Sequence, residues 1–173
     1  MTAYFPAAKK AEGNSKVVFV PALVDPDAVT VAEVTGGFDV SNFITGGNWQ
    51  PSADQAKGDD RRHGSKETFE QLGRTKWTIA NLVYVADPQA APADPDNEAY
   101  ETFVEGTTGY FLHRLGLDVD TDAVAAQKWN VYPVELGAQV DTPIAADDEF
   151  AKLTVTQAVA VTGPVHRDVA LTA

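Results

Sequence analysis

The last part of the chain carries the most regular alternation of apolar and polar residues. Within the stretch 150–165, four apolar residues recur at a spacing of two, and only Gln157 breaks their series: Leu153, Val155, Val159 and Val161. The residues between them are small or polar, which is typical of a β-strand with one buried face. A strand of roughly a dozen residues spans about 40 Å and is longer than most. It favours a barrel, a tube or an extended sheet, although an ordinary edge strand of a β-sandwich shows the same pattern.

Shorter runs predict the other strands. They are rich in β-branched and aromatic residues, and they fall at 16–20, 38–44, 66–72, 74–86, 109–117 and 128–139. Gly73 separates the third run from the fourth. The fourth run has apolar residues on both faces, with Trp77, Ile79, Val83 and Val85 sharing one of them, so this strand is expected to be covered on both sides. Pro133 indicates an edge position or a bulge in the last run, because proline has no N–H to give to a sheet.

A very short helix is predicted by a capping box. Thr30 and Glu33 have the Thr-x-x-Glu spacing in which each side chain can bond the backbone of the other, and Gly36 stands where the helix would end. The valines of this segment would also suit a strand.

A clearer helix is expected to begin at Asp94, with Pro95 at its first position. Tyr100, Phe103 and Val104 form an apolar stripe, and Gly106 ends the helix after about three turns. This helix should lie against a sheet face.

Together these patterns predict a β-rich α+β fold with about seven strands, mostly antiparallel, and one well-defined helix. A chain of 173 residues is long enough for one domain with its own core. We expect a flexible N-terminal segment at 1–15 and a β-sandwich or barrel domain at 16–173. Residues 48–65 are polar, with Trp49 as their only large apolar residue, and predict a long loop. Loops of this length in compact domains are commonly functional or disordered.

Composition narrows the classes of function. Cysteine is absent, which excludes disulfides and thiolate metal sites. No apolar run approaches the roughly 20 residues of a membrane span, and the first residues lack the apolar core of a signal peptide. The formal charge of −12 disfavours tight binding to nucleic acid. Such a charge serves solubility, and it would also suit a surface past which DNA slides without sticking.

The sequence has no arrangement typical of an enzyme. Three histidines lie far apart, without the spacing of metal ligands on one helix: His63, His113 and His166. The Asp-x-Asp-x-Asp pattern at 118–122 resembles the start of a calcium loop, but Ala123 and Trp129 stand where that loop needs glycine and glutamate. Nucleophile elbows, phosphate-binding glycine loops and dinucleotide-binding fingerprints are absent. No catalytic residue, cofactor or metal is therefore predicted.

Six stretches, taken in order, resemble the tail tube (major tail) proteins of long-tailed, siphovirus-type bacteriophages, particularly those infecting actinobacteria. The stretches are residues 30–47, 65–75, 94–100, 105–110, 130–138 and 153–165. They are spread over the chain after Val20, and the resemblance rests on their order and combined length.

This resemblance implies a β-sandwich subunit with one flanking α-helix, whose long strands join those of neighbouring copies into an oligomeric β-barrel. Six copies would close a hexameric ring, and stacked rings would form the tube through which DNA passes, without specific binding, during ejection. The implied partners are further copies of the chain, a tape measure protein, a tail terminator, tail assembly chaperones and a distal tail protein. The same resemblance implies assembly in the host bacterial cytoplasm, a final place in the virion tail and no contact with a membrane.

Two groups of residues are candidates for this assembly. We predict that the 48–65 loop contacts the next ring, with Trp49 as an apolar anchor and four mixed charges beside it: Asp59, Asp60, Arg61 and Arg62. We also predict that Glu67 and Glu70 lie near the lumen. At most one of these two can point inward, since they would occupy opposite faces of a strand.

Two alternative functions stay open. A head-tail joining or tail terminator protein would form one ring that does not stack. A small-ligand or carbohydrate-binding β-barrel module would use Trp49, Trp77 or Trp129 as stacking platforms. The binding module would stay monomeric or small, whereas a tube subunit would form rings or polymers.

Overall fold

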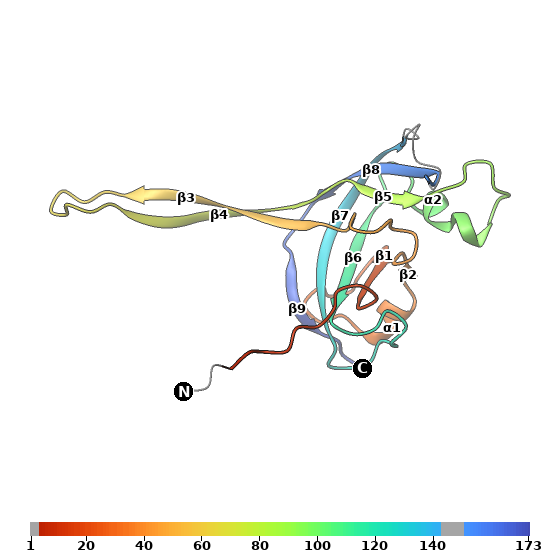
Figure 1. The fold of residues 1–173 in the computed structure, drawn as a ribbon, viewed down its shortest axis with the longest axis horizontal. Helices are drawn as coiled ribbons and strands as arrows, with labels where there is room; N and C mark the ends of the chain where they lie inside the picture. Colours follow the sequence, from red (N-terminus) through yellow and green to blue (C-terminus); the bar gives the residue numbers. More distant parts are fainter. Residues whose placement is uncertain (1–3, 143–150) are drawn as a thin grey trace.

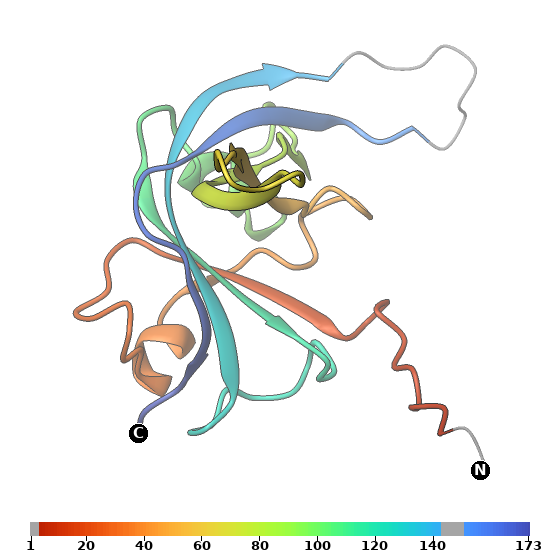
Figure 2. The same ribbon diagram turned by 90° about the vertical axis from the view of Figure 1, so that its left-hand side faces the viewer.

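One antiparallel sheet forms the body of the protein, and a separate two-stranded sheet projects from it (Figure 1). The structure is a computed structural model that describes residues 4–142 and 151–173. The strands of the body are β1 (Ser15–Val20), β2 (Phe38–Asp39), β5 (Leu82–Val85), β6 (Thr108–Leu115), β7 (Lys128–Asp141), β8 (Thr154–Val161) and β9 (His166–Ala170). Their order is β2-β1-β6-β7-β8-β5, and β9 also pairs with β7. Figure 2 shows that this sheet curls into a half-barrel.

Both faces of the sheet are covered, because alternate residues of β1 and β6 enter different cores. Phe19 and Phe111 belong to a core that also holds Phe103, and the ring centroid of Phe19 lies 5.3 Å from each of the other two. Val18 and Leu112, one residue away on each strand, belong to a second core. Neighbouring residues of a strand point to opposite faces, so one sheet serves two cores. The prediction of a β-rich, mostly antiparallel fold is confirmed; the body is a curled sheet and not two facing sheets.

The short helix α1 (Val31–Thr35) follows the prediction from its capping box. The N–H of Glu33 donates to the Thr30 hydroxyl at 3.2 Å, and the Glu33 carboxylate accepts from the N–H of Thr30 at 2.8 Å. The Glu33 carboxylate accepts hydrogen bonds from the N–H groups of Val24 and Thr30 and from the Thr30 hydroxyl, and these bonds lower the pKa of Glu33. Val34 is the residue of α1 that enters the second core.

The second helix is shorter than predicted. A 3₁₀ turn, η1 (Pro95–Asn97), leads into α2 (Glu98–Thr102), and the Asp94 side chain caps it by accepting from the N–H of Asp96. The helix ends before Phe103, which is fully buried, and Val104 of the expected apolar stripe is exposed. Phe103 takes a non-helical backbone conformation as it enters the core, so the helix stops there and not at Gly106.

Pro133 lies within the sheet and not at its edge. It pairs with Tyr110 of β6, and its carbonyl accepts from the N–H of Thr162 on the other side of β7. Since the nitrogen and carbonyl of a strand residue point to the same side, the missing N–H falls where the partner of β7 changes from β8 to β9. Proline is tolerated there because the ladder is interrupted at that point.

The predicted loop at 48–65 is wrong over most of its length. Residues Pro51–Asp60 form strand β3, which pairs antiparallel with β4 (Phe69–Ile79). Apolar alternation signals a strand with one buried face, and β3 is exposed on both faces. Its polar sequence therefore gave no strand signal.

The strand break predicted at Gly73 is also wrong. Strand β4 runs through Gly73 and ends at Ile79. Residues 80–81 separate it from β5. This two-residue break changes the alternation: Leu82 and Tyr84 are fully buried, while Val83 and Val85 are half-buried. Ile79 was expected to share one strand face with Val83. The core instead takes Ile79 together with Leu82 and Tyr84.

The C-terminal strand is shorter than predicted, although its alternation is correct. Strand β8 spans Thr154–Val161 within the predicted stretch, and Phe150 lies outside the described residues. Val155 and Gln157 are buried, whereas Leu153 is exposed. Gln157, which interrupts the apolar series in the sequence, thus occupies one of the most buried positions of the strand.

Gly109 is required by the close approach of β6 to β1. A Cβ at this position would lie 2.5 Å from the Phe19 ring and 2.8 Å from the Val20 carbonyl oxygen. We expect Gly109→Ala to destabilise the protein by about 1–3 kcal/mol, because the buried Phe19 ring cannot move away without disturbing its aromatic neighbours. Urea unfolding would measure the change. The matched control is Gly64→Ala, where no atom lies within 4 Å of the added methyl group and the change should stay within about 0.5 kcal/mol. Equal stabilities for the two variants would contradict this reading of the contact.

Candidate assembly interface

Strands β3 and β4 form an arm, defined here as residues 51–79, that projects from the body along the longest axis of the protein (Figure 1). The ten residues of β3 span about 33 Å at about 3.3 Å per residue. Almost every arm residue is exposed, apart from those at its base. There Ile79 is buried in the core, and the ring of Trp77 packs edge-on against Tyr132 at 6.2 Å. The arm is therefore held by its base alone.

A β-bulge divides the arm. Gln55 pairs with Thr75 and Lys57 pairs with Leu72, so Gly73 and Arg74 together oppose one residue, Ala56. Beyond the bulge, the two faces of the arm each carry one large exposed apolar residue: Leu72 is 67% exposed and Phe69 is 54% exposed. Their odd spacing of three in a strand places them on opposite faces. Each face of the arm therefore has one large apolar side chain available for contact with another chain.

The outer part of the arm has three ion pairs between its own side chains. Arg62 approaches Asp60 at 2.7 Å and Arg61 approaches Asp59 at 3.2 Å, and Lys57 lies 3.5 Å from Glu70. The hydrogen bond with Asp60 raises the pKa of Arg62. Surface pairs of this kind contribute little to stability. They do neutralise three of the five carboxylates of the arm.

Charge is divided unequally between the arm and the rest of the chain. The arm has six cations, Lys57, Arg61, Arg62, Lys66, Arg74 and Lys76, against five carboxylates, Asp54, Asp59, Asp60, Glu67 and Glu70. Its net charge is +1. Because the whole chain has a net charge of −12, the residues outside the arm carry −13. Two bodies that approach each other are strongly repelled, whereas an arm and a body are attracted.

Comparison with known proteins shows to which family the chain belongs. The whole chain, residues 1–173, matches a family model described as phage tail tube protein. The chain belongs to this family. As a phage tail tube protein it is a structural component of the virion tail, assembles with other tail proteins into a tube, and is not an enzyme. Among curated proteins, none matches the chain.

The tube protein brings four of the predicted contact residues together, but not the fifth. Asp59, Asp60, Arg61 and Arg62 lie side by side at the outer end of β3. Trp49 lies before the arm begins and packs into its own subunit, with ring centroids 5.1 Å from Phe111 and 5.8 Å from Tyr132. Trp49 therefore anchors the base of the arm to the body of the same copy.

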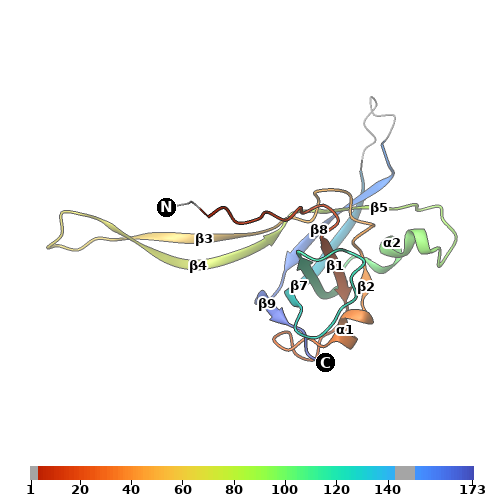
Figure 3. The ribbon, with the colours of Figure 1, turned by 60° about the horizontal axis from the view of Figure 1, so that its bottom comes forward.

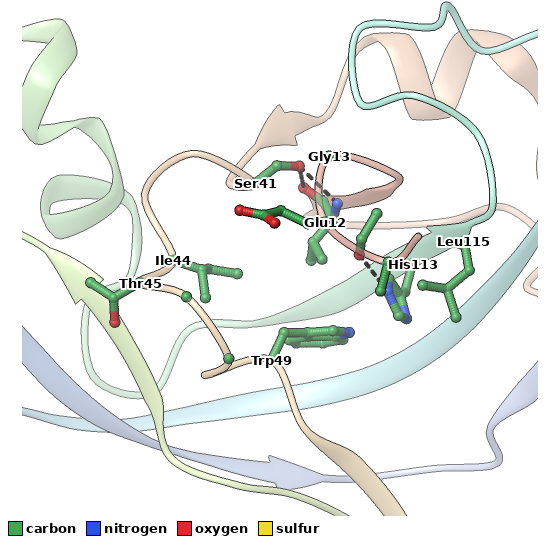
Figure 4. A pocket seen from close by; sticks show the side chains of 13 residues that line it. Glu12, Gly13, Ser41, Ile44, Thr45, Trp49, His113 and Leu115 are labelled. Carbon is green, nitrogen blue, oxygen red and sulfur yellow. Dashed lines mark hydrogen bonds between the residues drawn. The ribbon is translucent and has the colours of Figure 1, made fainter. Parts of the chain in front are cut away.

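Trp49 also forms part of a pocket of about 570 Å³ (Figure 4). His113 lines the same pocket beside Trp49, with the two ring centroids 5.6 Å apart, and its Nε2 is 3.0 Å from the Ser15 hydroxyl. Burial lowers the pKa of His113 to about 4, so its ring is neutral near pH 7. The other two histidines lie elsewhere, His63 at the end of the arm and His166 on β9 beside Asp27.

The two glutamates predicted near the lumen both lie in the outer arm. Glu70 is on β4 and pairs with Lys57, whereas Glu67 lies in the turn between the strands. The argument from opposite strand faces therefore does not apply to Glu67. A place near the lumen stays a prediction for both residues.

The 118–122 segment binds a cation of the chain itself through backbone carbonyl oxygens. The Arg114 guanidinium is buried, stacks over the Trp129 ring at 5.2 Å and donates to the carbonyl oxygens of Asp118 and Thr121. Sequence patterns missed this arginine because they gave no sign that a charged residue of β6 would be buried. Across residues 4–142 and 151–173, no cluster of three or more His, Asp or Glu side chains is arranged to hold a metal ion.

The tryptophans do not form an exposed stacking platform for a sugar. Trp129 is 1% exposed, and Trp49 and Trp77 pack against aromatic residues of the body. In the part of the chain that the structure describes, the helices are all too short or too polar to cross a membrane.

Proposed function

We propose that this tail tube protein closes into hexameric rings and that the arm of each copy contacts the next ring of the stack. The observation that carries the proposal is the arm itself. It is exposed over almost its whole length and carries exposed Phe69 and Leu72, yet it contributes little to the core of its own subunit. Such an element is costly to order unless it gains contacts elsewhere.

The curled sheet supports closure into a ring. Strand β5 pairs with β8 only over Thr154–Gln157, so residues 158–161 have no strand partner on the side opposite β7 among the described residues. Unpaired strand edges invite pairing with another chain, and closed barrels remove such edges. Half-barrels that join edge to edge would form the continuous wall of a tube.

The finer features of the tube follow from the resemblance of the sequence. The tube carries DNA during ejection, and the low affinity of an acidic protein for phosphate suits such a conduit. Its partners are the tape measure protein, the tail terminator, the tail assembly chaperones and the distal tail protein of a siphovirus-type phage infecting actinobacteria. Assembly takes place in the host cytoplasm. Glu67 or Glu70 would contribute acidic charge near the lumen.

Negative-stain electron microscopy of the purified protein, with light scattering after size exclusion, tests the proposal. We expect hollow tubes with a regular axial repeat and sixfold end views, which become more frequent as the protein is concentrated. Tail initiator components should be added where the protein alone stays monomeric. Isolated rings that never stack would favour the joining or terminator alternative, and a protein that stays monomeric under both conditions would contradict the proposal.

A further inference from the structure

The arm and an acidic segment lie at opposite ends of the protein. Figures 1 and 3 both show the arm extending to one side of the body and α2 with its preceding loop on the other. A copy displaced along this axis would bring the arm of one subunit to the α2 side of the next. Contacts between two different surfaces of identical chains repeat without limit, as a stacked tube requires.

The segment on the α2 side, residues 87–105, is the most acidic described part of the chain. It has six carboxylates, Asp87, Asp94, Asp96, Glu98, Glu101 and Glu105, and no lysine or arginine. All but Asp94 belong to exposed residues. Val104 in the same segment is 56% exposed, which gives this surface an apolar residue as well.

The arm cations that form no ion pair have the charge opposite to that of the 87–105 segment. Three of the six arm cations pair with arm carboxylates, whereas Lys66, Arg74 and Lys76 have no carboxylate within 4.0 Å among the described residues. Phe69 and Leu72 lie between Lys66 and Arg74 in the sequence, and each supplies one exposed apolar side chain to one face of the arm. The arm therefore presents unpaired positive charge with apolar side chains, and the 87–105 segment presents negative charge with Val104.

We propose that the arm of one copy docks on the 87–105 segment of a copy in the adjacent ring. This inference rests on the proposed function, and it names the surface that receives the arm. Charge selects the site, because the remainder of the chain is acidic and the arm is the only long projecting element of the described residues with net positive charge. Complementary charge sets the register and speed of such contacts, while the apolar residues supply buried area.

A charge-swap experiment tests the pairing. One variant reverses the arm (Lys66→Glu, Arg74→Glu and Lys76→Glu), and a second reverses the acceptor (Asp96→Lys, Glu98→Lys and Glu105→Lys). A third variant combines all six substitutions and so restores opposite charges. We expect each triple variant to raise the protein concentration needed for tubes about tenfold or more, and the combined variant to return within about threefold of the wild type.

A matched control reverses three carboxylates outside the acceptor: Asp120→Lys, Asp122→Lys and Asp141→Lys. It changes net charge as the acceptor variant does and should not weaken tube formation. Circular dichroism and urea unfolding would show that each variant is folded. Impaired triple variants without rescue in the combination would overturn the pairing, as would triple variants that assemble normally. Either result leaves the tube itself intact, whereas a wild-type protein that forms no tubes under any condition removes the proposed function and this inference with it.

Discussion

A subunit with a shortened arm is expected to fold normally and to form no tubes. Lys57 and Leu72 are directly paired across the arm, so a two-residue Asn-Gly turn can replace residues 58–71 and close the hairpin. The replacement removes the four-charge cluster at the end of β3 together with Phe69, Glu67 and Glu70. It leaves Trp77 and Ile79 at the base, where they pack on the body. Stability should therefore change by less than about 1 kcal/mol.

Two measurements separate assembly from folding. Urea unfolding reports the stability of the subunit, and electron microscopy with light scattering reports rings and tubes. We expect rings to survive, since their closure depends on the body, and the axial repeat of a stacked tube to be lost. The full-length control is Gly64→Ala, which keeps the length and the charges of the arm and adds a methyl group with no atom within 4 Å; it should form normal tubes. Normal tubes from the shortened protein would show that the arm does not join rings.

Sequence patterns predicted the body of this protein well, because its strands bury one side-chain face and so show apolar alternation in the sequence. The β1 and β6 runs and the alternation of β8 reflect side chains that face a core, whereas the capping box of α1 is a local hydrogen-bond motif; the structure confirms all four. The resemblance to tail tube proteins gave the family, which the match over the whole chain confirms.

Strand β3 of the arm could not be predicted in the same way. Its residues alternate between two exposed faces, so hydrophobicity has no period to detect. Its strand character comes from backbone pairing with β4, where the runs at 66–72 and 74–86 did predict strand. The mixed charges at 59–62 lie at the exposed outer end of the arm, and their contact with the next ring stays a prediction. Trp49 packs on the core of its own subunit, since a lone aromatic in a polar stretch can mark the point where that stretch joins the core; its contact with the next ring stays a prediction.

Gln157 shows the opposite error, in which a polar residue that looks like an interruption is part of the core. Its side chain is fully buried, and its Nε2 donates to the carbonyl oxygens of Phe103 at 2.7 Å and Gly137 at 2.8 Å. Its Oε1 accepts from the Tyr84 hydroxyl at 3.1 Å, and that hydroxyl in turn accepts from Gln139. Burial raises the pKa of Tyr84 to about 12, so the hydroxyl keeps its proton throughout the physiological range. This network ties the end of α2 to the sheet.

Replacing Gln157 with leucine is expected to destabilise the protein by about 2–4 kcal/mol. The substitution keeps the volume and leaves two buried carbonyl oxygens and one hydroxyl without their partner, and an unsatisfied buried group costs roughly 1–3 kcal/mol. Tyr84→Phe removes only the hydroxyl and should cost about 1–2 kcal/mol. Urea unfolding of both single variants and the double variant gives a double-mutant cycle, and we expect the two costs to be less than additive because the residues share one hydrogen bond. Additive costs would mean that the hydrogen bond between them contributes nothing. An unchanged stability for Gln157→Leu would mean that the core gains as much from an apolar side chain as it loses in hydrogen bonds.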